Sequence, residues 1–533
     1  MMSSDRSRGW TAQGWGPRLA MIAAGAIAVL GFAPFHFWGV TLLSLTILFV
    51  RLIGVSRWAR PGRAGFWTGL LFGLGWFSAS CFWIASAFIE RGPEFLPMIP
   101  PLVGGLAVVL ALFWAVAGSV AARMMGGASI WRAGLIFVAA FMIAELARGH
   151  ILSGFPWNMA AYAFEPGGAT SQVASLIGVY GLTMIIYIAA ALIGIAVLLR
   201  DWRPALGVVL ILAGMIGFGS WRLSTATIET QPGVTLRLVD VPFRQSEKMN
   251  PDTSVQIVNR YIAASLEPGI ETVTHLVWPE GAVNGLAIEN EPLLSAMGAL
   301  LTQRTATPPV WLMNSLRIEV SPDGEGRPKR RYYNSSVAIT FDEFGNPAVA
   351  ATNDKAKLVP FGEFIPGGEW VERIGARLVS TALGSISPAS DKRIANFPGL
   401  PPISPQICYE VIFPGLTPRG GQNGQAAPQA ILNQSNDAWF GGTIGPAQHA
   451  AIARYRAIEE GLPLIRSASN GISGVFDPFG RADRVLDGSL DGHIDAVLPL
   501  PLGPKLPMTW VNAALSLLNL CLLLLGMIGL RRR

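Results

Sequence analysis

The chain has few cysteines and few charged residues for its length. Its 533 residues include three cysteines, Cys81, Cys408 and Cys521, which supply no disulfide framework and no zinc-binding spacing. Charged residues make up 14% of the chain and hydrophobic residues 51%, and this balance excludes an ordinary soluble protein of this size. We therefore expect an integral membrane protein that needs no metal and no organic cofactor.

Long apolar runs predict eight transmembrane helices. A helix needs about 20 apolar residues to cross the hydrocarbon core of a bilayer. Two runs lie between Arg18 and Arg51, broken near Gly31, and the others cover residues 64–89, 95–122, 133–152, 170–199, 204–221 and 506–530. Because the first run continues almost at once into the second, a cleaved signal peptide is not expected.

Basic residues in the connections between the runs predict how the bundle is oriented. Arginines gather in alternate connections, whereas the opposite connections hold little beyond Arg91 and Arg148. By the positive-inside rule both termini are cytoplasmic and the long segment 223–505 lies outside the cytoplasm. Much of the net charge of +6 is then a topological signal, and no nucleic-acid partner is expected. The expected parts are a bundle of helices 1 to 7 at residues 1–222, an external domain at 223–505, and helix 8 with a cytoplasmic tail at 506–533.

The external segment has the pattern of a globular α/β domain. Short β-type runs alternate with polar stretches that suit helices, which is typical of that class. The β-type runs are residues 234–241, 275–278, 309–314, 332–341 and 430–432, and the helical stretches are 254–266, 291–304 and 448–460. Flexible segments are expected at 321–330, 367–393 and 420–429.

Three residues of this segment stand in settings that suit catalysis. Glu280 follows the apolar run that starts at His275, Lys355 precedes an apolar turn, and Cys408 follows a strand-like run at 404–407. Strand ends are where α/β folds present catalytic groups. Taken alone, each residue also has an ordinary interpretation, as a surface glutamate, a solvated lysine or a buried thiol.

Two questions stay open at this point. Lys355 and Lys357 would face the same way in a strand, so geometry does not choose between them. A thiol also needs a nearby base or cation to react at neutral pH. His275, His449 and His493 do not stand in settings typical of a Cys–His pair, although adjacency in space is not decided by sequence; a carboxylate with a lysine is the other way to activate a thiol.

Taken in order, these settings resemble the Glu-Lys-Cys triad of the nitrilase superfamily. The resemblance rests on Trp278-Pro279-Glu280, on Lys355 before Leu358-Val359-Pro360-Phe361-Gly362-Glu363, and on Ile407-Cys408-Tyr409-Glu410. With its membrane helices, the chain resembles the bacterial apolipoprotein N-acyltransferase family almost from end to end. That resemblance implies an α/β domain, a nitrilase-like αββα sandwich, inserted between helices 7 and 8 of an eight-helix transmembrane bundle. It also implies a location in the bacterial inner membrane, with the domain facing the periplasm.

The resemblance implies a role for each residue of the site. Glu280 would be the general base and Cys408 the nucleophile, and Lys355, rather than Lys357, would be the cation that stabilises a tetrahedral oxyanion. Glu363, Tyr409 and Glu410 match supporting positions, although Tyr409 also suits simple packing.

The implied reaction moves a fatty acyl chain between two lipid substrates. A membrane phospholipid would acylate Cys408 as a thioester, and the α-amino group of the N-terminal diacylglyceryl-cysteine of an apolipoprotein would then accept the chain, in ping-pong order. The implied partners are this donor, this acceptor and the lipid bilayer, and the enzyme is expected to be a monomer.

Four further residues are candidates for lipid access. Met249 stands where the family commonly has a tryptophan that handles lipid. Trp370 lies in the amphipathic stretch 369–379, which predicts either a mobile arm that enters the membrane interface or a helix packed on the domain. Trp157, in an external loop, would line the lipid entrance or anchor in the aromatic belt, and Trp439 lies within the run from Asn436 to Gly441 that the family shares.

Other interpretations fit parts of the sequence. A membrane-anchored amidase or nitrile hydrolase would use the same triad with water as acceptor, but it has no use for eight helices. A catalytically silent scaffold would not need Glu280, Lys355 and Cys408 together. Inside the bundle, Glu145 and Arg148 lie three apart on one helical face and are expected to form a structural ion pair.

Overall fold

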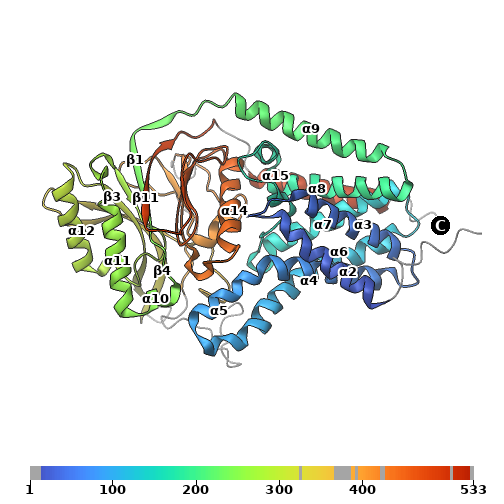
Figure 1. Ribbon diagram of the computed structural model, residues 1–533, viewed down its shortest axis with the longest axis horizontal. Coiled ribbons are helices and arrows are strands. Elements are labelled where there is room, and N and C mark those ends of the chain that lie inside the picture. The colour runs from blue at the N-terminus through green and yellow to red at the C-terminus, as the bar shows by residue number, and fades with distance from the viewer. Residues whose placement is uncertain are drawn as a thin grey trace, which may run out of the picture. The chain divides into compact units, whose positions relative to one another are not determined.

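The computed structural model describes residues 14–322, 327–364, 386–390, 394–420, 426–503 and 508–527. The chain forms two compact units (Figure 1). The helical unit comprises Met1–Ala226, Thr443–Tyr455 and Leu506–Arg533, and the sheet unit comprises Thr227–Gly442 and Arg456–Lys505. The segment Thr443–Tyr455 therefore groups with the helices, although it belongs to the predicted external domain in sequence.

The helical unit is built from the predicted apolar runs. Its long helices are α2 (Trp15–Ile27), α3 (Trp38–Val55), α4 (Pro61–Cys81), α6 (Gly105–Met125), α7 (Ile130–His150), α8 (Ala174–Leu199), α9 (Arg203–Ser224) and α15 (Met508–Met527), with the short α5 (Ala85–Arg91) between α4 and α6. Seven helical stretches of the described chain are long and apolar enough to span a membrane, six of them before residue 226 and the seventh at Met508–Leu525. The first predicted span, Trp15–Gly31, is helical but shorter.

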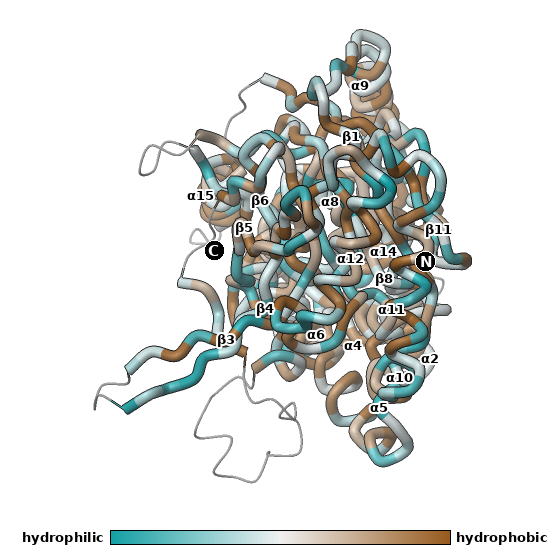
Figure 2. Tube along the Cα trace, turned by 90° about the vertical axis from the view of Figure 1, so that its left-hand side faces the viewer, coloured by the Kyte–Doolittle hydropathy of each residue, from teal (hydrophilic) through white to brown (hydrophobic). Residues whose placement is uncertain are grey.

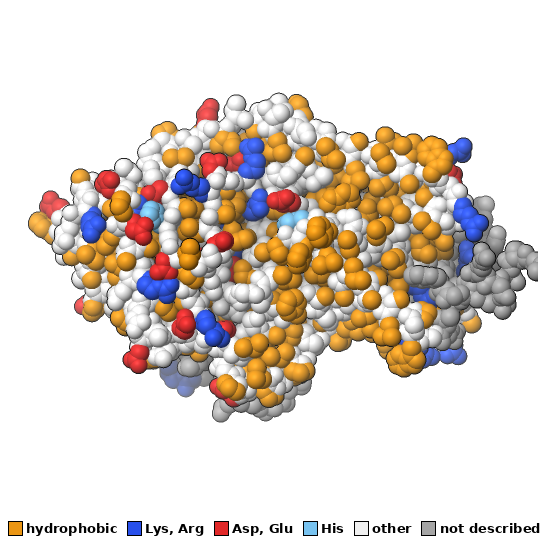
Figure 3. Space-filling model, in the orientation of Figure 1, with side chains coloured by type: hydrophobic (Ala, Val, Ile, Leu, Met, Phe, Trp, Pro, Cys, Tyr) orange, Lys and Arg blue, Asp and Glu red, His pale blue; other side chains and the backbone are white. Residues whose placement is uncertain are grey.

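Glycine lets neighbouring helices of this unit approach closely. A Cβ atom at Gly69 of α4 would lie 2.1 Å from the backbone oxygen of Trp114 on α6, and one at Gly65 would lie 2.1 Å from that of Gly118. In lipid there is no hydrophobic driving force between helices, so their association depends on the close packing that small residues permit. Figure 3 shows the outcome: hydrophobic side chains cover most of the visible helical surface, and basic side chains gather at its right-hand end.

The predicted ion pair inside the bundle is confirmed. Glu145 and Arg148 of α7 are both 1% exposed and form a salt bridge. The indole N–H of Trp114 donates to Glu145 at 2.6 Å, and Arg148 donates to the backbone oxygens of Phe155 at 2.5 Å and Trp157 at 2.9 Å. The buried pair thus holds the loop that follows α7.

The sheet unit contains two sheets and the helices that cover them. One sheet has the order β11-β1-β2-β3-β4-β5 and the other β10-β9-β8-β7-β6. The first is made of β1 (Thr230–Asp240), β2 (His275–Val277), β3 (Val310–Pro322), β4 (Pro328–Phe341), β5 (Pro347–Asp354) and β11 (Gly492–Pro499). The second is made of β6 (Ile403–Pro405), β7 (Ala430–Asn436), β8 (Leu464–Ser469), β9 (Ser473–Phe476) and β10 (Val485–Leu486).

Alternation along the strands builds two cores. Leu276 of β2 and Trp311 of β3 pack with Tyr261 of α11 (Pro251–Ser265) and with α12 (Glu291–Arg304), whereas Val277 and Leu312, the next residue of each strand, pack against the second sheet. Successive side chains of a strand point to opposite faces, so one face of the first sheet carries helices and the other carries the second sheet.

Every strand and helix expected from the external segment is found, with shifted ends. The largest shift concerns the segment 321–330, expected to be flexible. All of its described residues except Arg327 belong to β3 or β4, and Ser321 pairs with Lys329. Figure 2 shows these two strands projecting beyond the rest of their sheet. Most of the expected segment 367–393, including Trp370 and the stretch 369–379, lies outside the described residues.

Candidate active site

The three predicted catalytic residues each follow the end of a strand. Glu280 comes three residues after β2, Lys355 directly after β5, and Cys408 three residues after β6. The charges of Glu280 and Lys355 both act on the Cys408 thiol. Strands from two packed sheets therefore bring together residues that are far apart in the sequence.

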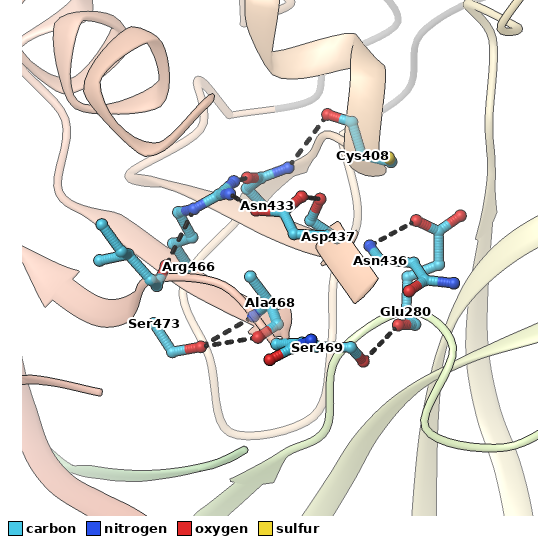
Figure 4. A network of polar contacts seen from close by, with 12 residues as sticks. Glu280, Cys408, Asn433, Asn436, Asp437, Arg466, Ala468, Ser469 and Ser473 are labelled. Carbon is cyan, nitrogen blue, oxygen red and sulfur yellow. Dashed lines mark hydrogen bonds and ion pairs between the residues drawn. The ribbon is translucent and has the colours of Figure 1, made fainter. Parts of the chain in front are cut away.

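Glu280 is held through both carboxylate oxygens. Its Oε1 accepts a hydrogen bond from Asn334 Nδ2 at 2.8 Å. Its Oε2 accepts one from the backbone N–H of Asn436 at 2.9 Å, which Figure 4 shows. The backbone oxygen of Glu280 accepts a third from Ser469 Oγ at 2.8 Å. These bonds fix the direction of a carboxylate that is available as a base.

Lys355 is a buried cation between carboxylates. Its side chain is 1% exposed, and its Nζ lies 2.8 Å from Glu363 Oε1. Burial alone would lower the pKa of Lys355, but the charges of Glu363 and Glu280 outweigh it and raise that pKa above its ordinary value. The lysine is thus a permanent positive charge. Lys357, by contrast, is exposed and its Nζ lies 5.3 Å from the centre of the Phe413 ring. The structure therefore distinguishes Lys355 from Lys357, which their spacing in the sequence did not.

Cys408 occupies a strained turn. It begins a short 3-10 helix, Cys408–Ile412, with φ at +49°, a region that residues other than glycine seldom adopt. Burial raises the pKa of the Cys408 thiol and the charge of Glu280 raises it further, while Lys355 only partly offsets both. The thiol is therefore protonated at neutral pH, and its attack on a substrate requires a base to take the proton.

A buried polar network supports the cysteine from the second sheet. Asn433 donates to the backbone oxygens of Gln406 at 2.6 Å and Cys408 at 3.5 Å, and it accepts from Arg466 (Figure 4). Arg466 also forms an ion pair of 2.7 Å with Asp437. Because both partners are almost fully buried, this pair needs its additional hydrogen bonds to be stable.

Glu410 connects the lysine segment to the cysteine segment. Its Oε1 accepts from the backbone N–H groups of Ala356 at 2.8 Å and Lys357 at 3.0 Å, and its Oε2 accepts from that of Ile407 at 2.8 Å. Glu410 is fully buried. The predicted supporting residue is therefore a clamp between the two segments. Glu363 has the similar task of holding Lys355, since its other oxygen accepts from the N–H of Val359 at 2.8 Å.

The remaining predicted residues are more scattered. Tyr409 is 9% exposed and packs edge-on against Phe413, and Trp439 is half-buried in the helical turn Asp437–Phe440 of the sheet unit. Met249 ends α10 (Gln245–Met249) and is 55% exposed. Trp370 lies outside the described residues.

Trp157, proposed to line a lipid entrance or to anchor at the interface, is buried among other side chains. It belongs to the helical unit and is only 4% exposed. Its ring lies 4.9 Å from that of Trp83 and 5.6 Å from that of His449, and its indole N–H donates to Gln448 at 2.9 Å. The bond from Arg148 to its backbone explains why the loop turns inward.

Two residues of the site were not found from the sequence. Asn334 bridges Glu280 and Glu363, donating to the latter at 3.2 Å, and Asn314 sets its orientation by donating to its Oδ1 at 2.6 Å. Lys248 is 5% exposed and close to Glu280, and burial lowers its pKa to about 8 although Glu280 opposes the shift. Both looked like ordinary surface residues in strongly polar stretches.

Both ring nitrogens of His275, one of the three histidines considered as partners for the thiol, are occupied. His275 uses both ring nitrogens, one at 2.8 Å from Thr274 Oγ1 and one at 2.9 Å from the backbone oxygen of Pro398. Within the described ranges, no group of three or more histidine, cysteine or acidic side chains is placed to hold a metal ion.

Comparison with known proteins covers both units. Residues 24–192 match the model of the apolipoprotein N-acyltransferase N-terminal domain, and residues 247–484 match the carbon-nitrogen hydrolase model. Curated proteins named apolipoprotein N-acyltransferase are similar along most of their length. That of Bradyrhizobium diazoefficiens is 35% identical, with 92% of this chain and 91% of the relative aligned. That of Allorhizobium ampelinum is 34% identical with 97% of each aligned, and that of Caulobacter vibrioides is 36% identical with 93% and 90% aligned. The chain therefore belongs to the apolipoprotein N-acyltransferase family, the acyltransferases of the carbon-nitrogen hydrolase superfamily that carry membrane-spanning helices.

Proposed function

We propose that this enzyme transfers a fatty acyl chain from a membrane phospholipid to the α-amino group of the N-terminal diacylglyceryl-cysteine of an apolipoprotein, through a thioester on Cys408. The observation that carries the proposal is that three strand ends bring together the Cys408 thiol, the hydrogen-bonded carboxylate of Glu280 and the buried Lys355 in its ion pair with Glu363. The relatives are named for apolipoprotein N-acylation, which supplies the acceptor class.

In the first half-reaction Cys408 is acylated. Glu280 takes the thiol proton as the sulfur attacks the ester carbonyl carbon of the phospholipid, and the negative charge that forms on the carbonyl oxygen is stabilised by Lys355. Collapse of this intermediate breaks the ester C–O bond. Glu280 returns the proton to the departing glycerol oxygen, so that a lysophospholipid leaves and a thioester remains.

In the second half-reaction the acceptor amine attacks the thioester carbonyl. Lys355 again faces the oxyanion, Glu280 takes a proton from the attacking nitrogen, and the C–S bond breaks. The proton passes to the Cys408 sulfur, which restores the starting thiol, and the product is an amide. One nucleophile serves both halves, so the kinetics are expected to be ping-pong.

The membrane helices indicate where the reaction takes place. Withdrawing an acyl chain from the bilayer costs about 0.8 kcal/mol per CH₂ group, so the thiol must act at the membrane surface. We infer an eight-helix bundle, counting Trp15–Gly31 as the first span, with both termini in the cytoplasm and the sheet unit on the periplasmic side of the inner membrane. A monomer suffices, because one chain supplies all three catalytic groups.

Mapping of the acyl adduct tests the proposal. The purified full-length enzyme is incubated with phospholipid alone, digested and examined by mass spectrometry, and a diacylglyceryl peptide with a free amine is then added. We expect a thioester on the Cys408 peptide that the peptide amine clears and water does not, absent in Cys408→Ala and retained in the matched control Cys521→Ala. An adduct cleared by water alone would instead indicate a hydrolase, and no adduct on that peptide would refute the transferase mechanism.

A further inference from the structure

A basic cavity opens at one end of the helical unit. It has a volume of about 440 Å³ and lies where α2 and α4 begin and α3 ends. Its lining includes four arginines, Arg18, Arg51, Arg60 and Arg63, and none of the described residues that line it is acidic. These arginines belong to the basic connections that predict the orientation of the bundle, and they also surround a cavity.

The cavity is amphipathic. Arg51 of α3 is 8% exposed and lies 5.2 Å from the ring of Trp58, whereas Arg18, Arg60 and Arg63 are exposed. Along α4 the lining continues from Arg63 through Trp67 to Leu71, four residues apart and therefore on one face of the helix. The cavity is therefore cationic where the arginines lie and apolar along the face of α4 that carries Trp67 and Leu71.

Four guanidinium groups around one space favour an anionic occupant. Cations near a bilayer are stable when they are paired or face a phosphate-rich surface, and basic pockets between transmembrane helices bind lipid headgroups. Guanidinium groups suit phosphate because their planar donors bind its oxygens in pairs. The half-exposed Trp67 is of the type that lies at headgroup depth, and Leu71 beyond it suits the start of an acyl chain.

We propose that this cavity binds the phosphate headgroup of an anionic phospholipid, with the glycerol and the first part of an acyl chain along Trp67 and Leu71. The proposed orientation places this lipid in the cytoplasmic leaflet, where the acyl-transfer reaction does not take place. The bound lipid therefore holds the ends of α2, α3 and α4 together and is not the acyl donor.

Native mass spectrometry of the full-length protein, released from nanodiscs, tests the site. The nanodiscs contain phosphatidylglycerol and phosphatidylcholine with identical acyl chains. The site variant is Arg18→Gln/Arg60→Gln/Arg63→Gln, which changes only exposed arginines and spares buried Arg51. The control Arg57→Gln/Arg200→Gln/Arg203→Gln removes three exposed arginines, one between α3 and α4 and two where α8 ends and α9 begins, and none of them lines the cavity.

We expect phosphatidylglycerol to be retained by the wild type and the control, and its affinity to fall by about a hundredfold in the site variant. Acylation of Cys408 by phosphatidylethanolamine should be unchanged in all three proteins, which separates this site from the proposed function. Three results would overturn the proposal. The two variants could lose phosphatidylglycerol equally, or the wild type could retain phosphatidylcholine as well as phosphatidylglycerol. Inorganic phosphate, at the same concentration as the lipid, could also displace the bound phosphatidylglycerol.

Discussion

Changing Glu410 to glutamine isolates the clamp between the lysine and cysteine segments. The carboxylate accepts three backbone N–H groups at 2.8, 3.0 and 2.8 Å in a fully buried position. Glutamine keeps the shape but turns an NH₂ group toward at least one of these donors. One charge-assisted hydrogen bond, worth about 1.5–3 kcal/mol, is lost, and the donors left facing each other cost about 1–3 kcal/mol more.

A total near 4 kcal/mol corresponds to about three powers of ten in rate if all of it acts on the transition state. Some of it will appear as a lower free energy of unfolding, so we expect acylation of Cys408 to slow by about 100- to 1,000-fold. The assay follows acyl-enzyme formation by intact mass, with thermal unfolding of the same samples. Glu343→Gln, an exposed glutamate of the same unit, should match the wild type in both. If Glu410→Gln also matched it in both, the clamp would have no energetic role and the reasoning would be refuted.

Three further predictions concern the sheet unit. Burial raises the pKa of Asp240 to about 8, helped by the charges of Asp437 and Asp487 and opposed by the N–H of Asn470. The free energy of unfolding that this protonated carboxyl contributes is present at low pH and is lost as the pH rises toward 8, at up to about 1.4 kcal/mol per pH unit. Asp240→Asn should therefore flatten the pH dependence of thermal unfolding between about pH 5 and pH 9. An unchanged slope in the variant would contradict this prediction. The pKa of Lys248 is lowered to about 8 by burial, so the wild-type acylation rate should fall as the pH rises through 8 and the cation beside Glu280 is lost. Lys248→Met should be slower and should show no such fall in rate near pH 8. If the variant showed the same fall, Lys248 would not be its origin. Met249 is 55% exposed, so Met249→Trp should leave thermal unfolding unchanged and lower the KM for phospholipid through added apolar contact, whereas an unchanged KM would mean that this position does not meet lipid.

Much of the fold was predictable because its signals are local. Apolar runs of sufficient length and short β-type runs depend only on neighbouring residues, and the helices and strands were found where they indicated. The turn settings of Glu280 and Cys408 were equally local, since each follows the end of a short apolar strand.

The supporting residues were not predictable because they depend on register between strands. Asn334 lies in a strongly polar run of β4, and only its pairing with β3, which itself pairs with β2, brings its amide to Glu280. The burial of Trp157 depends on a similar contact between distant residues. An aromatic residue after a transmembrane helix is usually interfacial, but the buried Arg148 binds its backbone oxygen and draws the loop inward.

The charges of the site explain why two lysines accompany two carboxylates. Before attack, Glu280 and Glu363 are balanced by Lys355 and, below its pKa of about 8, by Lys248. In the mechanism we propose, Glu280 becomes neutral when it takes the thiol proton, and the negative charge reappears on the substrate oxygen next to Lys355. In this proposed mechanism the net charge of the buried site stays constant through acylation, and Lys355 exchanges one anionic partner for another while its ion pair with Glu363 is kept. Stabilisation of this kind needs no reorganisation of the protein, which is the condition under which a preorganised charge contributes most to catalysis.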